Sequence, residues 1–313
     1  MSNKFYRMKS IALASLLSIA TLVPLSAQNF PGDEALSKVL IAGEDWQLVG
    51  EGYGFTDGAC GDAEGNFYFS DLRKNVLHRV SPDGKVSVFL ENGPSISGLK
   101  FGPDGRLYAA TQAPKKQIIA IAPDTKEISV IAEAVQPNDL VVSHKGFVFF
   151  TDTGKGRVMV IDPEKKMRVA AEGISAPNGI TLSSDQGTLA VSEYKGTNVW
   201  VFRVEPDGSL AHGSRYMELR APVGRADSGG DGSTTDAQGR YYVTSHVGIQ
   251  MFDSTGRLGG VIAKPNAKGC VSVAFAGPNL EYLYACASDK VFRRKTQAKG
   301  ALFFKSPPAP VRK

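Results

Sequence analysis

Cysteine and histidine are scarce in this sequence, with three Cys and four His among 313 residues. The cysteines, Cys60, Cys270 and Cys286, form no Cys-x-x-Cys pair, so a structural zinc site is not expected. Cys270 and Cys286 can lie on neighbouring strands, and an exported compartment would permit a disulfide between them. The sequence leaves that pairing open, and at least one of the three thiols must stay free or pair elsewhere.

Several enzyme signatures are also missing. There is no Gly-x-Ser-x-Gly elbow and no His-Glu-x-x-His sequence, which removes the usual signals of α/β-hydrolases and zinc proteases. No Gly-x-Gly-x-x-Gly opens a helix, so dinucleotide binding is unsupported. Beyond the N-terminus, no apolar stretch is long enough to cross a membrane.

The one long apolar run lies at the N-terminus and is typical of a secretory leader. Three basic residues precede the apolar segment Ile11–Val23, and the small residue Ala27 suits a cleavage site. We therefore expect a signal peptide over 1–27, with an uncleaved membrane anchor as the alternative, and an exported protein that is periplasmic or secreted. Removing 27 residues, three of them basic and none acidic, leaves 286 residues with a net charge of +2. That balance predicts no nucleic-acid partner. Neither a membrane span after cleavage nor an obligate protein partner is expected.

A turn followed by an alternating apolar run recurs along the chain with a period near forty residues. The turn glycines are Gly65, Gly105, Gly146, Gly187 and Gly239, with a weaker copy at Leu280. Successive spacings are 40, 41, 41, 52 and 41 residues. An insertion around 215–229, rich in glycine and charge, accounts for the long spacing and predicts a loop.

Each unit contains strand signals only, punctuated by Pro-Asp-Gly turns. Six such units predict an all-β fold, a six-bladed β-propeller with four strands in each blade. We expect a single domain over 28–313 that ends in a short basic tail. The last unit is one strand short, and Asp45–Val49 can supply that strand and close the ring.

In a propeller of this kind, the innermost strand of each blade lines the central channel. Counting back from each turn finds an oxygen-bearing side chain at the same register in all six units: Asp57, Ser97, Asn138, Asn178, Asp231 and Ser272. If the blades are equivalent, these side chains converge at one mouth of the channel and offer hard oxygen ligands, which suit Ca²⁺ or Mg²⁺. The alternative is that Asn and Asp before Gly are ordinary turn formers. Recurrence at one register favours a functional ring, because buried carboxylates need a partner such as a metal.

The second strand of each blade returns to the same mouth, so its end predicts an outer polar rim. The rim residues are Asp71, Gln112, Asp152, Glu193, His246 and Ser288. Glu193 and His246 are candidates to bind the substrate and select among substrates. The alternative for His246 is a hydrogen-bonded histidine at a strand end.

Four segments resemble the signatures of the gluconolactonase/regucalcin family, also called senescence marker protein-like: Phe55-Thr-Asp-Gly-Ala, Pro137-Asn-Asp-Leu140, Pro177-Asn-Gly-Ile180 and Gly229-Gly-Asp-Gly232. The similarity extends from about Glu51 to Gly300. The resemblance implies a six-bladed propeller with one divalent metal at the channel mouth. Its ligands fall on Asp57, Asn178 and Asp231, with Asn138 near the metal and in contact with substrate.

Two positions depart from the family pattern. Asp57 stands where the family usually has Glu, and Ser97 stands where the bacterial branch commonly has Asn. Aspartate is one methylene shorter, so the metal can be displaced or reached through water. These departures leave the substrate open.

We therefore expect a lactonase, a metal-dependent hydrolase of a sugar lactone or related cyclic ester, acting on a small molecule. Ca²⁺ is the expected ion, with Mg²⁺, Zn²⁺ and Mn²⁺ as alternatives. The resemblance also makes Asp231 the general base, and a neighbouring cation would keep it ionised. Two alternatives stay open. One is a non-enzymatic exported propeller that binds a protein or sugar ligand with a structural metal. The other is a related propeller hydrolase of esters or organophosphates, or a strictosidine-synthase-like enzyme.

Overall fold

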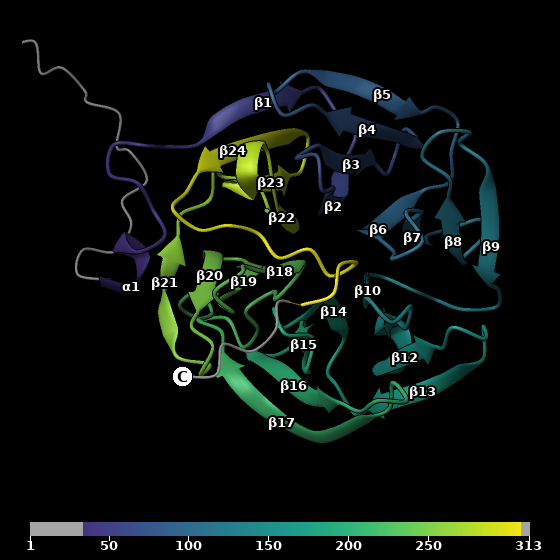
Figure 1. The fold of residues 1–313 in the computed structure, drawn as a ribbon. Helices are drawn as coiled ribbons and strands as arrows, with labels where there is room; N and C mark the ends of the chain where they lie inside the picture. Colours follow the sequence, from purple (N-terminus) through teal and green to yellow (C-terminus); the bar gives the residue numbers. More distant parts are fainter. Residues whose placement is uncertain (1–33, 308–313) are drawn as a thin grey trace, which may run out of the picture.

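The computed structural model describes residues 34–307, which fold into six four-stranded sheets arranged around a central axis (Figure 1). Neighbouring strands pair antiparallel in all six sheets, and the strands follow sequence order except in the closing sheet, where β1 lies beside β24. The predicted six-bladed β-propeller is confirmed, with one sheet for each repeat.

The innermost strands contact one another in order around the axis. They are β2 (Thr56–Gly61), β6 (Ile96–Phe101), β10 (Leu140–Val142), β14 (Pro177–Leu182), β18 (Ser233–Thr235) and β22 (Ser272–Ala276). The second strands are β3 (Phe67–Asp71), β7 (Leu107–Thr111), β11 (Val148–Asp152), β15 (Thr188–Glu193), β19 (Tyr241–Ser245) and β23 (Tyr282–Ala287). The repeated turns of the sequence lie between these two sets of strands.

The outer half of each blade consists of two further strands. The third strands are β4 (Val76–Val80), β8 (Ile118–Ile121), β12 (Arg157–Ile161), β16 (Asn198–Val204), β20 (Gly248–Phe252) and β24 (Lys290–Lys295). The outermost strands are β5 (Val86–Leu90), β9 (Ile128–Ala132), β13 (Met167–Glu172), β17 (Leu210–Glu218), β21 (Leu258–Ile262) and β1 (Gln47–Glu51). The helical elements are short: α1 (Glu34–Ser37), η1 (Thr153–Lys155) and η2 (Pro278–Leu280).

The ring is closed by a strand from the N-terminal side of the chain. β1 pairs antiparallel with β24, with Gln47 opposite Arg293 and Glu51 opposite Lys290. The expected closing strand is therefore confirmed, two residues further along than Asp45–Val49. Because the two sides of the described chain share one sheet, opening the ring would break the hydrogen bonds of that sheet.

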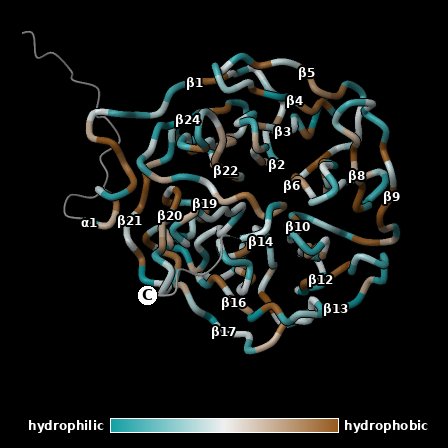
Figure 2. Tube along the Cα trace, in the orientation of Figure 1, coloured by the Kyte–Doolittle hydropathy of each residue, from teal (hydrophilic) through white to brown (hydrophobic). Residues whose placement is uncertain are grey.

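Apolar side chains fill the spaces between neighbouring blades. Phe149 and Val160 of one blade share a buried cluster with Ile180 and Val191 of the next. The inner strands are covered on both faces, so their residues are buried in continuous runs rather than at every second position. In β11, for example, every residue is buried. In Figure 2, brown stretches lie along parts of many strands, and many of the loops are teal. Burial of this kind stabilises the fold by about 25 cal/mol for each Å² of apolar surface.

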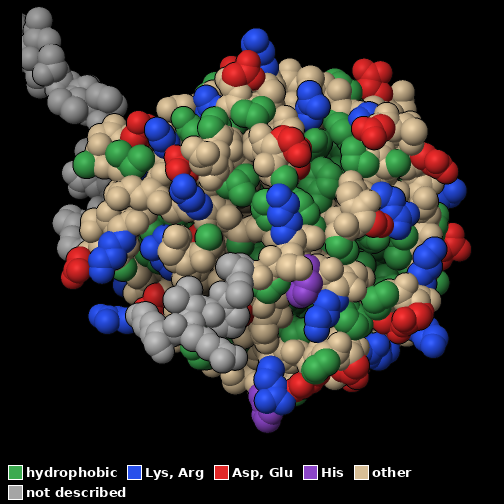
Figure 3. All heavy atoms as spheres, in the orientation of Figure 1, with side chains coloured by type: hydrophobic (Ala, Val, Ile, Leu, Met, Phe, Trp, Pro, Cys, Tyr) green, Lys and Arg blue, Asp and Glu red, His purple; other side chains and the backbone are tan. Residues whose placement is uncertain are grey.

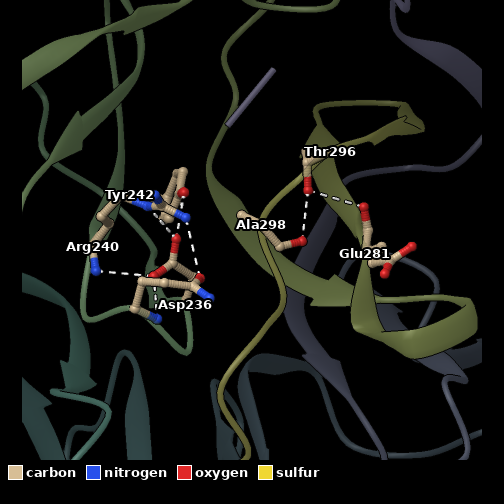
Figure 4. A network of polar contacts seen from close by, with 7 residues as sticks. Asp236, Arg240, Tyr242, Glu281, Thr296 and Ala298 are labelled. Atoms are coloured by element: carbon tan, nitrogen blue, oxygen red, sulfur yellow. Dashed lines mark hydrogen bonds and ion pairs between the residues drawn. The ribbon is translucent and has the colours of Figure 1, made fainter. Parts of the chain in front are cut away.

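Aspartates brace the turns between the first two strands. Asp236 accepts hydrogen bonds from the Tyr242 hydroxyl at 2.8 Å and from Arg240 Nε at 2.6 Å (Figure 4). The same pairing of aspartate with tyrosine recurs as Asp62 with Tyr68 and Asp104 with Tyr108. The repeat thus conserves a hydrogen-bonded turn as well as a strand pattern within this one chain.

The C-terminal part of the described chain, residues 297–307, runs across the centre of the ring (Figure 1). Gln186 Nε2 donates to the carbonyl oxygens of Phe303 and Lys305 at 2.9 and 3.0 Å, and Phe303 packs in an apolar cluster between two blades. The segment starts beside Thr296, whose hydroxyl donates to Glu281 O and Ala298 O, both at 3.0 Å (Figure 4). Figure 3, in the same orientation, shows side chains of both charge signs interspersed with apolar ones.

Two sequence expectations concern segments outside the blades. The predicted loop over 215–229 is partly wrong, because β17 continues to Glu218 and the loop begins only at residue 219. An outermost strand exposes one face to solvent, so its polar composition resembles that of a loop. The expected leader over 1–27 lies outside the described residues. Within residues 34–307, no helix is long and apolar enough to cross a bilayer.

Candidate functional site

The six recurring polar residues all lie where the innermost strands begin. We call this end of the central axis the site end. Asp57, Ser97 and Asn178 are second residues of innermost strands, Ser272 is a first residue, and Asn138 and Asp231 lie two residues before β10 and β18. The opposite end, crossed by residues 297–307, is the tail end.

Bulges turn the backbone at this level in three blades. The strand register shifts between Asp57 and Cys60, between Ile96 and Gly98, and between Pro177 and Ile180. A bulge re-aims a side chain relative to the regular alternation of its strand. The irregularity therefore coincides with the recurring polar positions.

Three buried or partly buried carboxylates interact through the axis near the site end: Asp57, Asp139 and Asp231. Burial, with added repulsion from Asp139, raises the pKa of Asp231 to about 8. Burial and the charge of Asp231 raise the pKa of Asp57 well above its ordinary value, and burial also raises the pKa of Asp139. With that pKa, Asp231 holds a proton at neutral pH unless a cation lies beside it.

Inter-blade hydrogen bonds fix the position of Asp231. Its N–H donates to Thr244 O at 2.9 Å, its carbonyl accepts from Ser192 Oγ at 3.0 Å, and its carboxylate accepts from the side chain of Asn178. The carbonyl of Asn178 accepts from Thr151 Oγ1 at 2.8 Å. Ser192 and Thr151 each lie on the second strand of the preceding blade, so the positions of Asn178 and Asp231 are set by how neighbouring blades meet.

Asn138 is positioned through its backbone. Ser97 Oγ donates to Asn138 O at 2.6 Å, and Gln112 Nε2 donates to Ser97 Oγ and to Pro137 O, both at 2.7 Å. Among residues 34–307, no hydrogen bond to the Asn138 side-chain amide is found. That amide is partly exposed at the site end and is free to meet a ligand.

Asp139 was missed because the count from each turn selected its neighbour. Its side chain is 8% exposed and accepts hydrogen bonds from Leu140 N at 2.8 Å and Ile180 N at 3.3 Å. The available signal was an acid placed directly before the wholly apolar strand β10, where a carboxylate needs partners.

Lys100 was missed as well. It lies on β6, its ammonium donates to Ala59 O at 3.2 Å, and its charge lowers the pKa values of Asp57 and Asp139 against the effect of burial. It also lines a cavity of about 30 Å³ between the axis and the C-terminal segment. A single charged residue within the largely apolar innermost strand β6 was the signal for this internal countercharge.

Three acids expected on the outer rim are instead committed to their own hairpins. Glu193 accepts hydrogen bonds from Trp200 Nε1 at 2.7 Å and Asn198 Nδ2 at 3.1 Å. Asp71 accepts from Gly54 N at 2.8 Å, and Asp152 accepts from Arg157 Nε at 3.0 Å. All three side chains are buried, so the structure does not bring them to the inner ring.

His246 lies at the site end, as expected, and is also hydrogen-bonded. Its Nε2 lies 3.1 Å from Asp227 Oδ1, which also accepts from Arg225 Nη2 at 3.0 Å. The edge of the Tyr194 ring packs against the imidazole at a centroid distance of 6.1 Å. Asp227 and Arg225 belong to the long loop that leads into Asp231, so this loop and His246 form one side of the rim.

The residues at the site end could hold a hard divalent cation, because they supply two carboxylates and two side-chain amides. Within residues 34–307, no group of three or more His, Cys, Asp and Glu side chains is arranged to hold a metal. A cation would therefore depend on the carboxylates of Asp57 and Asp231 together with amide oxygens of Asn178 and Asn138. Oxygen donors of this kind suit Ca²⁺ or Mg²⁺. Burial is the main cause that raises the pKa values of both acids, so a cation beside them would favour their ionised forms.

Residues 52–288, most of the chain, match the family described as SMP-30/Gluconolactonase/LRE-like region. The chain belongs to this family. The resemblance carried by the four short segments is therefore confirmed.

Individual family members support the same grouping. A gluconolactonase from Zymomonas mobilis is 26% identical over 304 residues, which cover 85% of each chain. A pentonolactonase from Haloferax volcanii is 24% identical over 228 residues, covering 71% of this chain and 77% of its own. The structure of a gluconolactonase from Xanthomonas campestris superposes with a TM-score of 0.71 at 22% identity, covering 84% of this chain and 92% of its own. This last similarity establishes the fold.

Proposed function

We propose that this protein hydrolyses a sugar lactone or related cyclic ester, using a divalent cation held at the site end. The observation that carries the proposal is the electrostatic interaction among Asp57, Asp139 and Asp231 at the site end, where Asp139 is buried, the other two are partly buried, and the pKa values of all three are raised. Family members named gluconolactonase and pentonolactonase support the lactonase class expected from the sequence.

Asp57, Asn178 and Asp231 would hold the cation, with Asn138 close by. When bound, a divalent ion supplies a Lewis acid for the lactone carbonyl and lowers the pKa of bound water. Ca²⁺ is our first choice, because the donors are oxygens of carboxylates and amides. Mg²⁺, Zn²⁺ and Mn²⁺ are the alternatives to be compared.

The chain's own residues divide the remaining work. Asp231 accepts the proton of the attacking water at its carboxylate; its pKa of about 8 falls toward the ordinary range when a cation lies beside it. Asn178 donates to that carboxylate and fixes its direction. The unbonded amide of Asn138 orients the substrate, and His246 contacts the substrate from the rim. Glu193 supports its hairpin through Trp200 and Asn198.

The test combines metal analysis with a lactone assay on the same purified protein. We would measure bound divalent metal and hydrolysis of glucono-1,5-lactone before EDTA, after EDTA and after each ion is restored. Asp231→Asn should abolish hydrolysis. Asp83→Asn, at an exposed acid in the β4–β5 turn, is the matched control and should leave hydrolysis unchanged.

Two other results would redirect the proposal. Stoichiometric metal without turnover of any lactone or ester would favour the non-enzymatic propeller with a structural metal. Failure to bind any divalent metal would contradict the proposed use of Asp57 and Asp231. We also propose that the reaction occurs outside the cytoplasm, which N-terminal sequencing of the exported protein would test, with Gln28 as the expected first residue.

A further inference from the structure

The hairpins between second and third strands carry basic side chains at the site end of four consecutive blades. These side chains are Arg73, Lys74, Lys115, Lys116, Lys155 and Lys195, and all are exposed. We call them the cation rim. The fifth blade places His246 at the corresponding hairpin.

Most of the cation rim has no acidic partner. Lys74 lies 3.9 Å from the buried carboxylate of Asp71, and the other five rim residues form no ion pair within the part of the chain that the structure describes. Long exposed cations without partners stay available to an anion that arrives from solvent.

The exposed glutamates of the site end lie farther from the axis than the cation rim. They stand at or just after the ends of the outermost strands, where the blades face the perimeter: Glu51, Glu91, Glu133, Glu172 and Glu218. In the four blades that carry the cation rim, the acids of the hairpins are buried and hydrogen-bonded, as described for Glu193. In the sixth blade, Asp289 of the corresponding hairpin is partly exposed and pairs with Lys268. Charge is therefore sorted radially, with exposed cations nearer the axis and exposed carboxylates at the outside.

The charges within the axis do not oppose an approaching anion. The positive charge of Lys100 acts on Asp57 and Asp139, and one divalent cation would offset the two negative charges that remain among these acids and Asp231. An anion at the site end would then meet an axis of no net charge, surrounded by the cation rim. Lys155 and Lys195 belong to the same two blades that supply Asn138 and Asn178.

We propose that the cation rim recognises an anionic group on the substrate, so that the preferred lactone carries a carboxylate or a phosphate away from its ring ester. This inference rests on the proposed lactonase function and names its substrate class. The ring ester occupies the site end beside Asn138 and Asp231, and the anionic group reaches Lys155 and Lys195. Two opposite charges in water at contact distance attract enough to change affinity about five-fold.

The experiment compares lactones that differ in the group at C6. Glucono-1,4-lactone is the neutral match for saccharo-1,4-lactone, which carries a carboxylate, and glucono-1,5-lactone is the neutral match for 6-phosphoglucono-1,5-lactone, which carries a phosphate. We expect kcat/KM to be higher for at least one anionic lactone, and the preferred anion identifies the source of the charge. Added NaCl should erase this advantage, because the Debye length falls from about 30 Å at 0.01 M to about 3 Å at 1 M. Neutral lactone hydrolysis should respond little to salt.

Reversing the charges of two rim lysines tests whether they bind the anionic group of the substrate. In Lys155→Glu/Lys195→Glu, KM for the preferred anionic lactone should rise at least about five-fold, with the neutral lactone unchanged. The control Lys145→Glu/Lys166→Glu makes the same change in net charge at exposed tail-end positions of one blade and should match the unmodified protein. Thermal unfolding of both variants would verify that they fold.

The outcomes separate the two proposals. Equal kcat/KM values on neutral and anionic lactones, without a salt effect, would overturn the role proposed for the cation rim and leave the lactonase proposal intact. An anionic preference that survives in Lys155→Glu/Lys195→Glu would also overturn it. Failure to hydrolyse any of the four lactones, with the divalent ion present, would contradict the lactonase proposal and remove the basis of the inference.

Discussion

Gly179 lies so close to Asp231 that the two backbones leave no room for a side chain between them. A Cβ built on Gly179 would stand 2.1 Å from the carbonyl oxygen of Asp231 and 2.8 Å from the Cα of Gly232. The glycine after Asn178 thus permits the approach of two blades at the level of the candidate site. It explains why a glycine follows Asn178 in the sequence.

Replacing this glycine should damage activity and stability together. In Gly179→Ala, the methyl group must push Asp231 or its own strand aside, at a cost of about 1–3 kcal/mol. A displacement near 1 Å at a reacting group can lower the rate about 100-fold. We expect both a lower Tm and a large loss of kcat/KM on the lactone substrate.

The control for this variant lies in the same blade. A Cβ at Gly187 would meet its nearest neighbour, the Asp185 carboxylate, at an ordinary 3.5 Å. Gly187→Ala should therefore keep near-normal activity. Normal kinetics in Gly179→Ala would show that the approach of the two blades does not position Asp231.

The stability of the cation-free protein should fall as pH rises. The folded pKa of Asp231, about 8, exceeds its ordinary value of 3.8, so the folded state binds a proton that the unfolded state has released. Stability from this group is complete below about pH 4 and is lost as pH rises through about 8. After EDTA treatment, Tm should drop between pH 5 and pH 8.

A divalent cation should reverse that trend, because it binds the ionised form of the folded state. Calorimetry at pH 5 and pH 8, with and without CaCl₂, would show a larger Tm gain at pH 8. Asp231→Asn removes the titrating group and should flatten the pH dependence. An identical slope in Asp231→Asn would assign the effect to other groups.

The ring and the inner positions could be predicted because they follow from spacing. Counting back eight residues from the turn glycine located Asp57 and Asp231, and counting back nine, where the turn is one residue longer, located Asn178. The same offset failed to find Asp139, because β10 begins late and both Asn138 and Asp139 precede it. Counting residues back from a turn assumes that every strand starts at the same position, so it cannot predict a strand that starts later.

Side-chain direction at strand ends could not be predicted in the same way. The sequence placed Glu193 at the rim correctly, but its carboxylate is held by Trp200, which lies across the hairpin on β16. Whether a strand-end acid faces solvent, the axis or its own hairpin depends on donors that only the packed blade supplies. The role of Lys100 depended likewise on the position of Ala59 in another blade.

Glu193→Gln should therefore lower stability more than substrate binding. Glutamine keeps one acceptor oxygen and presents an amide where the other accepted, so Asn198 or Trp200 loses its partner. A lost partner at a buried site costs about 1–3 kcal/mol. We expect a lower Tm with KM unchanged. Trp200→Phe should produce a similar loss of stability, whereas a rise in KM without a change in Tm would restore Glu193 to substrate binding.

The three thiols should resist reagents in the folded protein. Cys60, Cys270 and Cys286 are buried and free, and burial raises the pKa values of Cys60 and Cys270 to about 12. Thiolate is the reacting form, so labelling by a thiol-specific disulfide reagent at pH 8 should be slow. In guanidinium chloride all three should react. Rapid reaction of one native thiol, or a Tm that falls on adding dithiothreitol, would contradict this assignment.

The C-terminal segment should support the ring without taking part in the reaction. Phe303 is 7% exposed and packs between two blades at the tail end, so Phe303→Ala should cost about 3–5 kcal/mol. At about 2–4 °C for each kcal/mol, Tm should fall by roughly 10 °C. Because Asp57 and Asp231 lie at the other end of the axis, kcat and KM measured well below that Tm should stay normal. Lys305→Ala keeps the backbone carbonyl that Gln186 binds and serves as the control. A loss of kcat in Phe303→Ala at low temperature would show instead that the tail end is coupled to the site end. Lys100 would be the residue to examine, because it lines the cavity beside the C-terminal segment.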